Sequence, residues 1–302
     1  MKGEKSKLVI YAYSALAVIL WGLSYIWSNK LIEQDIPVEY FVFVRVLFAG
    51  GILLVLNLAT GVDVKINRKD LPKFLLLALC EPFIYFICET YGIGLTESPT
   101  YSAMIIATTP IFALFAGIIF FREKLSATNV IGFIVCLAGI SLVTLSKSAV
   151  GDRFTLGVIL LAIAVFAEVG QACCTKWLAG DYDPRVITMY QFLIGSVYLS
   201  PLFFTKGLNH FNPETYLVWS VWEPILMLAI LCSCLCFTLW VSSIKHLGVA
   251  KSAVLQALIP IVTAVAGIIL GSEILTGIQW LGIAVASLGV ILSQIAFKFR
   301  NQ

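Results

Sequence analysis

Polar groups that could bind a charged solute or exchange a proton lie inside long apolar segments of this chain. Glu81, Tyr85 and Glu89 are spaced four residues apart, so on a helix they share one face. Glu168 and Gln171 are three residues apart and would also share a face. Carboxyl groups in apolar surroundings could bind an ammonium group or take up a proton, and such groups are costly to keep there. We therefore expect the three glutamates to contact a substrate or a proton.

The composition places these residues in a membrane protein. The chain has 302 residues, is 60% hydrophobic and 12% charged, and has a mean hydropathy of +0.97, whereas soluble domains carry about 25% charged residues. The net charge is +3, but the basic residues are spread over short loops rather than gathered in one patch, so we expect no nucleic-acid partner. We expect a multi-pass protein of the cell inner or plasma membrane, surrounded by the lipid bilayer.

Ten apolar segments are long enough to cross a bilayer as helices, which takes about 20 residues each. Their approximate limits are 9–31, 38–59, 72–95, 99–121, 127–146, 156–178, 186–206, 219–244, 250–270 and 277–297. The loops between them are short, so any functional site must lie within the helices. The cysteines also lie inside these segments, where cysteine acts as a small hydrophobic residue. We expect no metal and no cofactor.

The chain contains an internal duplication. Residues 102–142 and 252–292 share fifteen identical positions at a constant offset of 150, without a gap. The identical pairs include Pro110 and Pro260, Glu123 and Glu273, Gly132 and Gly282, and Gly139 and Gly289. This period is far longer than the roughly 20 to 50 residues of a solenoid repeat. The sequence predicts two halves of five spans each, residues 1–148 and 152–302.

Loop charges predict that the second half is inverted relative to the first. If the N-terminus is cytoplasmic, the inner segments hold 15 Lys and Arg residues, the outer segments hold four, and Arg45 lies within a span. This distribution follows the positive-inside rule and places both termini in the cytoplasm. Because five is an odd number of spans, the second half must enter the membrane upside down. Inverted repeats are typical of transporters, whose substrates bind near the midplane between the halves.

The chain resembles the EamA-like branch of the drug/metabolite transporter superfamily. The residues that carry this resemblance are Trp21-Gly22 in the first span, Pro37 before the second, Arg45 within it, and the repeated pattern of Pro, a small and apolar stretch, Glu, Leu, Gly and Gly. The resemblance covers nearly the whole chain. It implies a ten-helix exporter or exchanger of small metabolites, often amino acids or related solutes, driven by gradients.

The third and sixth spans belong to opposite halves, which predicts a cavity between them. Its expected lining is Glu81, Tyr85, Glu89, Glu168, Gln171, Trp21, Trp240 and Gln256. Rings at such depth could stack on a cation or an apolar group, although a packing or lipid-facing role is the default for any one of them. Arg45 and Glu89 both fall in the outer part of the bundle and could form a buried ion pair with a purely structural role. A structural role is also open for Glu81 and Glu168.

The repeated residues suggest a shared framework. Pro110 and Pro260 fall near the middle of a span, where proline kinks a helix; the kinks would act as hinges beside the substrate path or merely shape the bundle. Glu123 and Glu273 fall at helix ends, and we interpret them as anchors. The repeated glycines allow close helix contacts. Because the glycine-rich fifth and tenth spans could also form a dimer, both a monomer and a homodimer are open.

These observations predict a secondary active transporter, not an enzyme, which exports or exchanges a small zwitterionic or cationic metabolite by alternating access. Proton coupling is open. One alternative is a nucleotide-sugar-type or other anion exchanger of the same superfamily, but such a cavity would need several basic groups and offers only Arg45. Another is a polytopic enzyme acting on lipids, but the chain has two His residues and no HExxH or Asp-rich motif.

Overall fold

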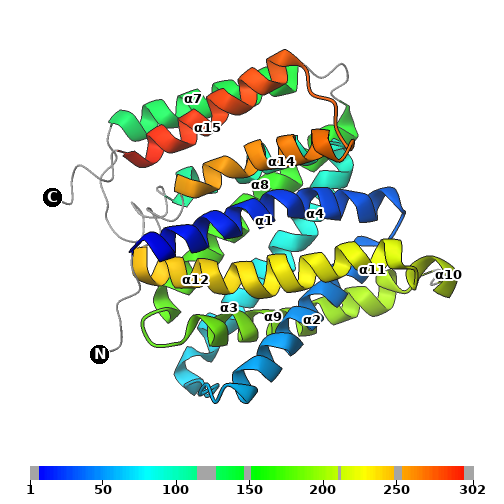
Figure 1. The fold of residues 1–302 in the computed structure, drawn as a ribbon, viewed down its shortest axis with the longest axis vertical. Coiled ribbons are helices and arrows are strands. Elements are labelled where there is room, and N and C mark those ends of the chain that lie inside the picture. The colour runs from blue at the N-terminus through cyan, green and yellow to red at the C-terminus, as the bar shows by residue number, and fades with distance from the viewer. Residues whose placement is uncertain (1–6, 114–126, 146–150, 210–211, 248–253, 296–302) are drawn as a thin grey trace.

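The computed structural model describes residues 7–113, 127–145, 151–209, 212–247 and 254–295, and all regular structure in these residues is helical (Figure 1). Seven of the helices are long and apolar enough to cross a membrane. The fourth expected span is described only as far as residue 113, and the last two are shorter apolar helices. The total of ten spans and the cytoplasmic termini therefore stay predictions. Glu123 lies outside the described residues.

The first half contains five expected spans. Its elements are α1 (Lys7–Glu33), α2 (Val38–Ala59), a 3-10 turn (Arg68–Asp70), α3 (Leu71–Ala78), a π-helical turn (Leu79–Ile84), α4 (Tyr85–Thr96), α5 (Pro99–Ile106) and α7 (Ala127–Leu145).

The second half follows the same order. Its elements are α8 (Asp152–Leu178), α9 (Pro184–Leu202), a π-helical turn (Phe203–Gly207), α10 (Pro213–Tyr216), α11 (Trp219–Leu226), a π-helical segment (Met227–Leu235), α12 (Cys236–Leu247), a 3-10 turn (Val254–Leu258), α14 (Ile259–Ile269) and α15 (Gly277–Ile295).

Local sequence signals set several of the helix starts. At the start of α9, the Asp183 side chain accepts a hydrogen bond from the Arg185 N–H, and Pro184 occupies a first-turn position where its missing N–H costs nothing. At the start of α15, Thr276 and Gln279 bond to each other's backbone N–H groups, which is the capping box that their spacing predicts. These caps replace backbone partners that the first turn of a helix lacks.

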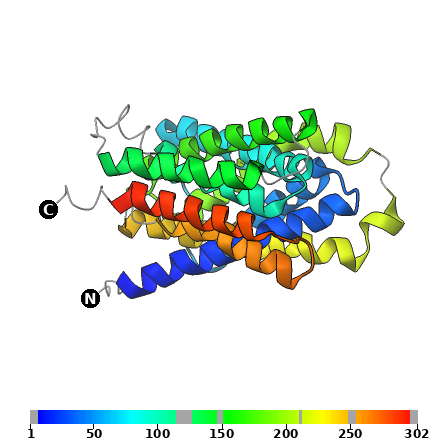
Figure 2. The same ribbon diagram turned by 90° about the horizontal axis from the view of Figure 1, so that it is seen from above.

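The helices lie in layers along the bundle. In Figure 1, α7 and α15 form one edge, α2, α3 and α9 lie toward the opposite edge, and α1, α4, α8, α12 and α14 lie between them. Both views place the start of α1 and the end of α15 on the same side of the bundle (Figures 1 and 2). The helices from both halves therefore surround a common centre.

Glycine allows α7 and α15 to touch backbone to backbone. A Cβ added at Gly132 would lie 2.3 Å from the Ser293 nitrogen, and one at Gly139 would lie 2.3 Å from the Ala286 nitrogen. The partner's number falls as the residue number rises, so the two helices run antiparallel, as an inverted repeat requires.

The same helix pair has twofold symmetry. A Cβ at Gly132 would lie 2.7 Å from the Gly289 oxygen, and one at Gly139 would lie 2.6 Å from the Gly282 oxygen. Gly132 and Gly282 are equivalent at the offset of 150, and so are Gly139 and Gly289. Exchanging equivalent residues therefore turns the first contact into the second, which is the relation that a twofold axis produces. These glycine faces cover each other within one chain and are not available for a dimer. The oligomeric state stays open.

Four spans have irregular backbone at membrane depth, in two pairs at equivalent positions. Glu81 has non-helical dihedrals of φ −147° and ψ 123° within its π-helical turn, and the π-helical segment of the eighth span includes the equivalent residues. In the fourth span α5 ends at Ile106 and the helix resumes at Thr109, while in the ninth span α14 begins at Ile259, 150 residues later. Irregular backbone in a membrane is tolerated where it lines a cavity or is buried in protein.

The two repeated prolines lie directly after irregular backbone, which we call a break in each case: a two-residue turn at 107–108 before Pro110, and a 3-10 turn (Val254–Leu258) that runs into α14 before Pro260. Pro110 and Pro260 each occupy the second residue of the resumed helix, where a proline removes no helical hydrogen bond. The expected kink within a continuous helix is therefore a break that ends just before the proline. Their role as hinges stays a prediction.

Candidate functional site

A central cavity, lined in part by these irregular segments, lies between the two halves. The structure brings together around it all eight residues that we expected to line a cavity: Trp21, Glu81, Tyr85, Glu89, Glu168, Gln171, Trp240 and Gln256. The remaining lining residues are Ser24, Tyr25, Arg45, Phe86, Ile106, Phe237 and Ile259. Both halves contribute, since α1, α2, α4 and α5 meet α8, α12 and α14 here.

The three carboxyl groups differ in their partners. Glu89 accepts a hydrogen bond from the Tyr85 hydroxyl at 2.7 Å. Glu168 accepts bonds on both oxygens, from the Thr109 hydroxyl at 2.6 Å and from the Gln256 amide at 2.8 Å. Glu81 is 3% exposed and has no hydrogen-bond or ion-pair partner among the described residues. Its carboxyl group is therefore the one left open toward the cavity.

Arg45 and Glu89, which the sequence offered as a possible ion pair, form none in the described part of the chain. Arg45 is 3% exposed, its Nε donates to the Ser233 hydroxyl at 2.7 Å, and its guanidinium carbon lies 3.9 Å from the centre of the Phe86 ring. The ion pairs of the described residues are all elsewhere. Stacking on Phe86 fixes the plane of the guanidinium, and Tyr85 already holds Glu89. In the described part of the chain the terminal nitrogens of Arg45 have no hydrogen-bond partner.

A third unsatisfied group is the side-chain amide of Gln171. This residue is 2% exposed, and its Nε2 has no hydrogen-bond partner among the described residues. A buried N–H without an acceptor costs about 1 to 3 kcal/mol. Gln171 lies one turn from Glu168 on α8, so the two side chains face the cavity together.

Aromatic rings form another part of the lining. The Trp21 ring packs edge-on against Phe237 and Trp240, with centroids 5.3 Å and 5.2 Å away, and its indole N–H donates to the Cys232 carbonyl at 3.2 Å. This bond fixes the orientation of the indole. Phe237 was not among the residues predicted to line the cavity, although its spacing of three residues from Trp240 was a usable signal. Ser233 was not predicted either, because a single serine in an apolar helix carries no signal.

A second, smaller cavity adjoins the first. It is lined by Thr109, Pro110, Ala113, Glu168, Gln171, Ala172, Trp240, Ile244 and Gln256, of which Glu168, Gln171, Trp240 and Gln256 also line the central cavity. Ile244 directly precedes Lys245 at the end of α12, and Ala172 lies one turn before Lys176 near the end of α8. The second cavity therefore lies toward the side that carries most of the basic loop residues, which we call the basic side and expect to be cytoplasmic.

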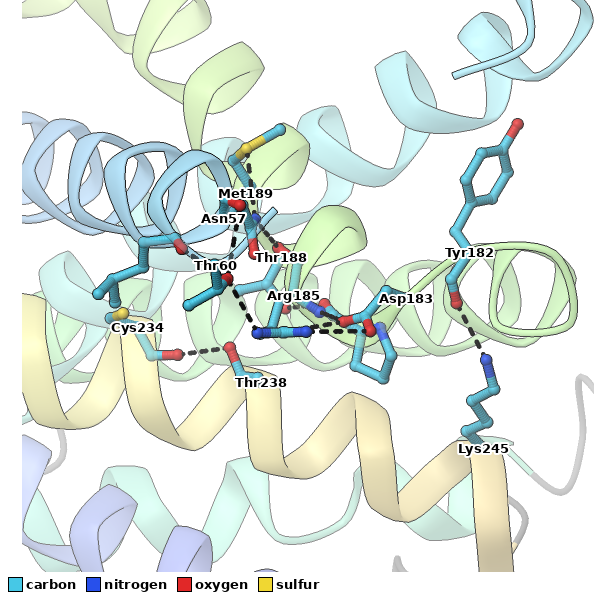
Figure 3. Close-up of polar contacts among 12 residues, drawn as sticks. Asn57, Thr60, Tyr182, Asp183, Arg185, Thr188, Met189, Cys234, Thr238 and Lys245 are labelled. Atoms are coloured by element: carbon cyan, nitrogen blue, oxygen red, sulfur yellow. Dashed lines mark hydrogen bonds and ion pairs between the residues drawn. The ribbon is translucent and has the colours of Figure 1, made fainter. Parts of the chain in front are cut away.

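Loops of both halves meet at the basic side (Figure 3). Arg185 Nε pairs with Asp183 Oδ1 at 3.2 Å, and Arg185 Nη1 donates to the Thr60 hydroxyl at 3.4 Å. Lys245 Nζ donates to the Tyr182 carbonyl at 3.1 Å. These contacts join the ends of α2 and α12 to the start of α9.

The opposite side also has contacts between the halves. Lys30 and Glu223 form an ion pair at 2.8 Å. Glu273 accepts hydrogen bonds from the Ser98 hydroxyl at 2.6 Å and from the Thr100 N–H at 3.1 Å, so it anchors the start of α5 to the loop before α15. Polar contacts thus bridge the halves on both sides of the cavities.

The sequence pattern of the EamA-like transporter family matches residues 8–145 and 155–294. An uncharacterized transporter of Archaeoglobus fulgidus is 25% identical over 92% of this chain and 96% of its own. A probable terminal-alkyne amino-acid exporter of Streptantibioticus cattleyicolor is 23% identical over 75% and 74% of the two chains. A protein of known crystal structure shares the fold with a TM-score of 0.74 at 15% identity, over 98% of this chain and 100% of its own. The chain is therefore a multi-pass membrane protein and belongs to the EamA-like transporter family.

Proposed function

We propose that this protein is a secondary active transporter that exports or exchanges a small zwitterionic or cationic metabolite across the inner or plasma membrane by alternating access. The observation that carries this proposal is the central cavity, which is lined by one acidic and one basic group that form no ion pair in the described part of the chain. They are the carboxyl group of Glu81 and the terminal guanidinium nitrogens of Arg45. The family match supports a membrane transporter in general.

Unpaired buried charges are expensive, because burial removes them from water without a compensating partner. At membrane depth such groups usually face a water-filled cavity or a substrate path. A zwitterionic solute would offer its ammonium group to Glu81 and its carboxylate to Arg45. The rings of Trp21, Phe237 and Trp240 would contact the apolar part of that solute. The Streptantibioticus relative is named a probable terminal-alkyne amino-acid exporter, which is consistent with such a substrate.

Glu89 and Glu168 are our candidates for proton coupling, together with Glu81. In the described residues, Glu89 and Glu168 accept hydrogen bonds only from neutral groups. A buried carboxyl group without a bonded cation can bind a proton at modest cost, because the neutral form avoids the penalty of desolvation. A proton taken up on one side and released on the other would drive solute in the opposite direction.

An anionic substrate fits this cavity less well. The described lining holds three carboxyl groups and a single basic side chain, Arg45. A nucleotide sugar would meet net negative charge, and like charges at short distance repel strongly where the dielectric constant is low. A lipid-processing enzyme has no support in the side chains either, because the described residues contain no cluster of potential metal ligands.

The test begins with a comparison of metabolites exported by cells with and without overexpression. The purified protein is then placed in liposomes with labelled amino acids and with the solutes found in that comparison. We expect transport without ATP, a rate that changes with an imposed pH gradient, and at least a tenfold loss in Glu81→Gln. Glu223→Gln is the matched control, because Glu223 pairs with Lys30 outside the cavity. If Glu81→Gln, Glu89→Gln and Glu168→Gln each leave transport and its pH dependence intact, the carboxylate hypothesis is wrong.

A further inference from the structure

The wall between the two cavities consists of groups that face both of them. Glu168 and Gln171 lie one turn apart on α8, with about 5 to 6 Å expected between their Cβ atoms. Gln256 and Trp240 complete the wall, so all four of its residues belong to the second half. A solute in either cavity can therefore reach the same carboxyl group and the same amide.

We propose that the second cavity is a separate binding position for the solute on the basic side, and that Glu168 and Gln171 pass the solute from one cavity to the other. This inference rests on the proposed transport function and adds a second position to it. The ligand class is a small solute with an ammonium group beside an acceptor oxygen. Its ammonium group binds Glu168, and its oxygen accepts from the Gln171 amide.

The unsatisfied Gln171 amide is the first support for this position. Its Nε2 is buried in the wall of both cavities without an acceptor in the described part of the chain. Buried polar groups of proteins are nearly always hydrogen-bonded, and an exception requires an explanation. An oxygen of a bound solute supplies the missing acceptor, and one turn of helix separates it from the carboxyl group that receives the ammonium group.

The partners of Glu168 explain how the wall can open. The Thr109 hydroxyl has one proton but two acceptors in range, Glu168 at 2.6 Å and the Ile106 carbonyl at 2.7 Å. When an ammonium group takes its place at Glu168, Thr109 can donate to Ile106 without losing a hydrogen bond. Among the described residues, the Gln256 amide is then the one donor to Glu168 that must give way.

Glu168 also links the backbone breaks of the two halves. Thr109 lies where the helix resumes in the fourth span, and Gln256 lies in the 3-10 turn of the ninth span. Both bind the same carboxyl group, so the solute that displaces them also disconnects the two breaks. Passage of the solute and separation of the halves are thereby coupled at one residue.

The second cavity can be probed on its own, because Ala172 lines it but not the central cavity. In a chain whose native cysteines are replaced by alanine or serine, Ala172→Cys is labelled from the basic side. The reagents are aminoethyl methanethiosulfonate, which carries an ammonium group, and the anionic sulfonatoethyl reagent of similar size. The control is Gly180→Cys, in the exposed loop after α8.

We expect Ala172→Cys to react at least tenfold faster with the ammonium reagent, relative to the same ratio at Gly180→Cys. Glu168→Gln should remove this preference at position 172 and leave the ratio at position 180 unchanged. Absence of reaction at Ala172→Cys, or a preference that survives Glu168→Gln, would overturn the proposal. Labelling does not depend on transport, so it judges the second position even if no solute is moved.

A second variant in the native chain covers the case in which the cysteine-free chain does not fold. Ala172→Leu fills the second cavity, and Ala138→Leu makes the same change on the exposed face of α7. With radiolabelled amino acids in liposomes, we expect at least a tenfold slower rate for Ala172→Leu, with binding to the detergent-solubilised protein within about twofold of the parent. Equal rates for both variants would refute the second position while transport itself stands; no transport by the parent would count against the proposed function.

Discussion

The α7/α15 contact is built from residues that both copies of the duplicated sequence share, whereas the lining of the central cavity is built from residues that only one copy has. Along α7 and α15 the glycines occur in both copies, and each copy's glycine meets the other's backbone in equivalent contacts. Around the cavity the polar groups occur in one copy only, because Leu231 and Leu239 occupy the positions equivalent to Glu81 and Glu89. The symmetric contact holds two copies together, whereas an asymmetric solute needs an asymmetric wall.

The backbone breaks combine both patterns. The helix resumes at Thr109 in one half and at Ile259 in the other, at equivalent positions. The side chains there differ: Thr109 and Gln256 bind Glu168, while their counterparts Ile259 and Ile106 are apolar. The two halves therefore share the position of the break, and they differ in the single side chains that form the site.

The largest effect is expected from substitutions that disrupt the symmetric glycine contact between α7 and α15. Gly139→Ala places a Cβ 2.3 Å from the Ala286 backbone nitrogen, where no side chain can move aside. We expect a loss of about 3 kcal/mol in stability, at the upper end of the usual cost of overpacking, and the same loss for Gly289→Ala. Thermal unfolding in detergent measures both.

The control for this prediction is Gly51→Ala on α2, where an added Cβ meets no atom within 4 Å. Alanine is the better helix former, so this variant should be as stable as the parent or up to about 1 kcal/mol more stable. If Gly139→Ala and Gly51→Ala unfold at the same temperature, close backbone packing is not what α7 and α15 require.

The next largest effect is expected when the two halves are made alike at one position of the cavity. Glu81→Leu introduces the residue that the second half has at the equivalent position. We expect transport to fall at least tenfold, equivalent to about 1.4 kcal/mol or more, without loss of stability, because the variant removes an unpaired buried carboxyl group. Transport in liposomes and thermal unfolding are measured on the same preparation. A destabilised variant with normal transport would mean that Glu81 is structural.

A smaller effect, on the free energy of unfolding, is expected where Thr109 and Gln256 both bind Glu168. Thr109→Val removes one donor to Glu168 and should cost about 1 kcal/mol. Gln256→Leu removes the other, and the double variant should differ from the sum because both donors share one carboxyl group. A double-mutant cycle on unfolding free energies checks this. Strict additivity would show that the two donors act independently.

The smallest effect is expected outside the bilayer, at the start of α9. Burial raises the pKa of Asp183, but hydrogen bonds from the Arg185 side chain and N–H outweigh it and hold the pKa below its usual value. A lowered pKa contributes stability above the ordinary value of about 3.9, and this contribution is lost as the pH falls through the lowered pKa.

Asp183→Asn isolates the charge, because asparagine keeps the cap. We expect it to be less stable than the parent by under about 1 kcal/mol at neutral pH, as for other exposed ion pairs. The difference in unfolding temperature between parent and variant should shrink as the pH is lowered below about 4 and approach zero in strong acid. A difference that persists unchanged at low pH would assign the effect to the cap rather than to the charge.

Local spacing accounted for much of the site. One turn of helix joins Tyr85 to Glu89 and another joins Glu168 to Gln171, so each pair lies on a common face. Assigning the two pairs to opposite halves was enough to predict a shared cavity, which Glu81 enters from the irregular turn before α4. The offset of 150 likewise identified the glycines that meet in α7 and α15. Such inferences succeed because helical periodicity and internal repetition are properties of the chain alone.

Long-range partners were beyond the sequence. Arg45 donates to Ser233, 188 residues away, and stacks on the ring of Phe86 instead of pairing with Glu89. The breaks before the two prolines replaced the expected kinks. Each outcome depends on rotamers and on the competition among several donors for one acceptor, which spacing along a helix does not encode.

The sequence by itself determined the membrane class, the duplication and the set of polar residues at membrane depth, because composition and periodicity express the cost of burying polar groups in lipid. Only the tertiary structure decided which of these groups satisfy each other. It gave Glu89 and Glu168 neutral donors, left Glu81 and the ends of Arg45 without partners among the described residues, and made Glu168 and Gln171 common to two cavities. Pairing depends on distances of a few ångströms between helices, and these exist only after the halves have packed.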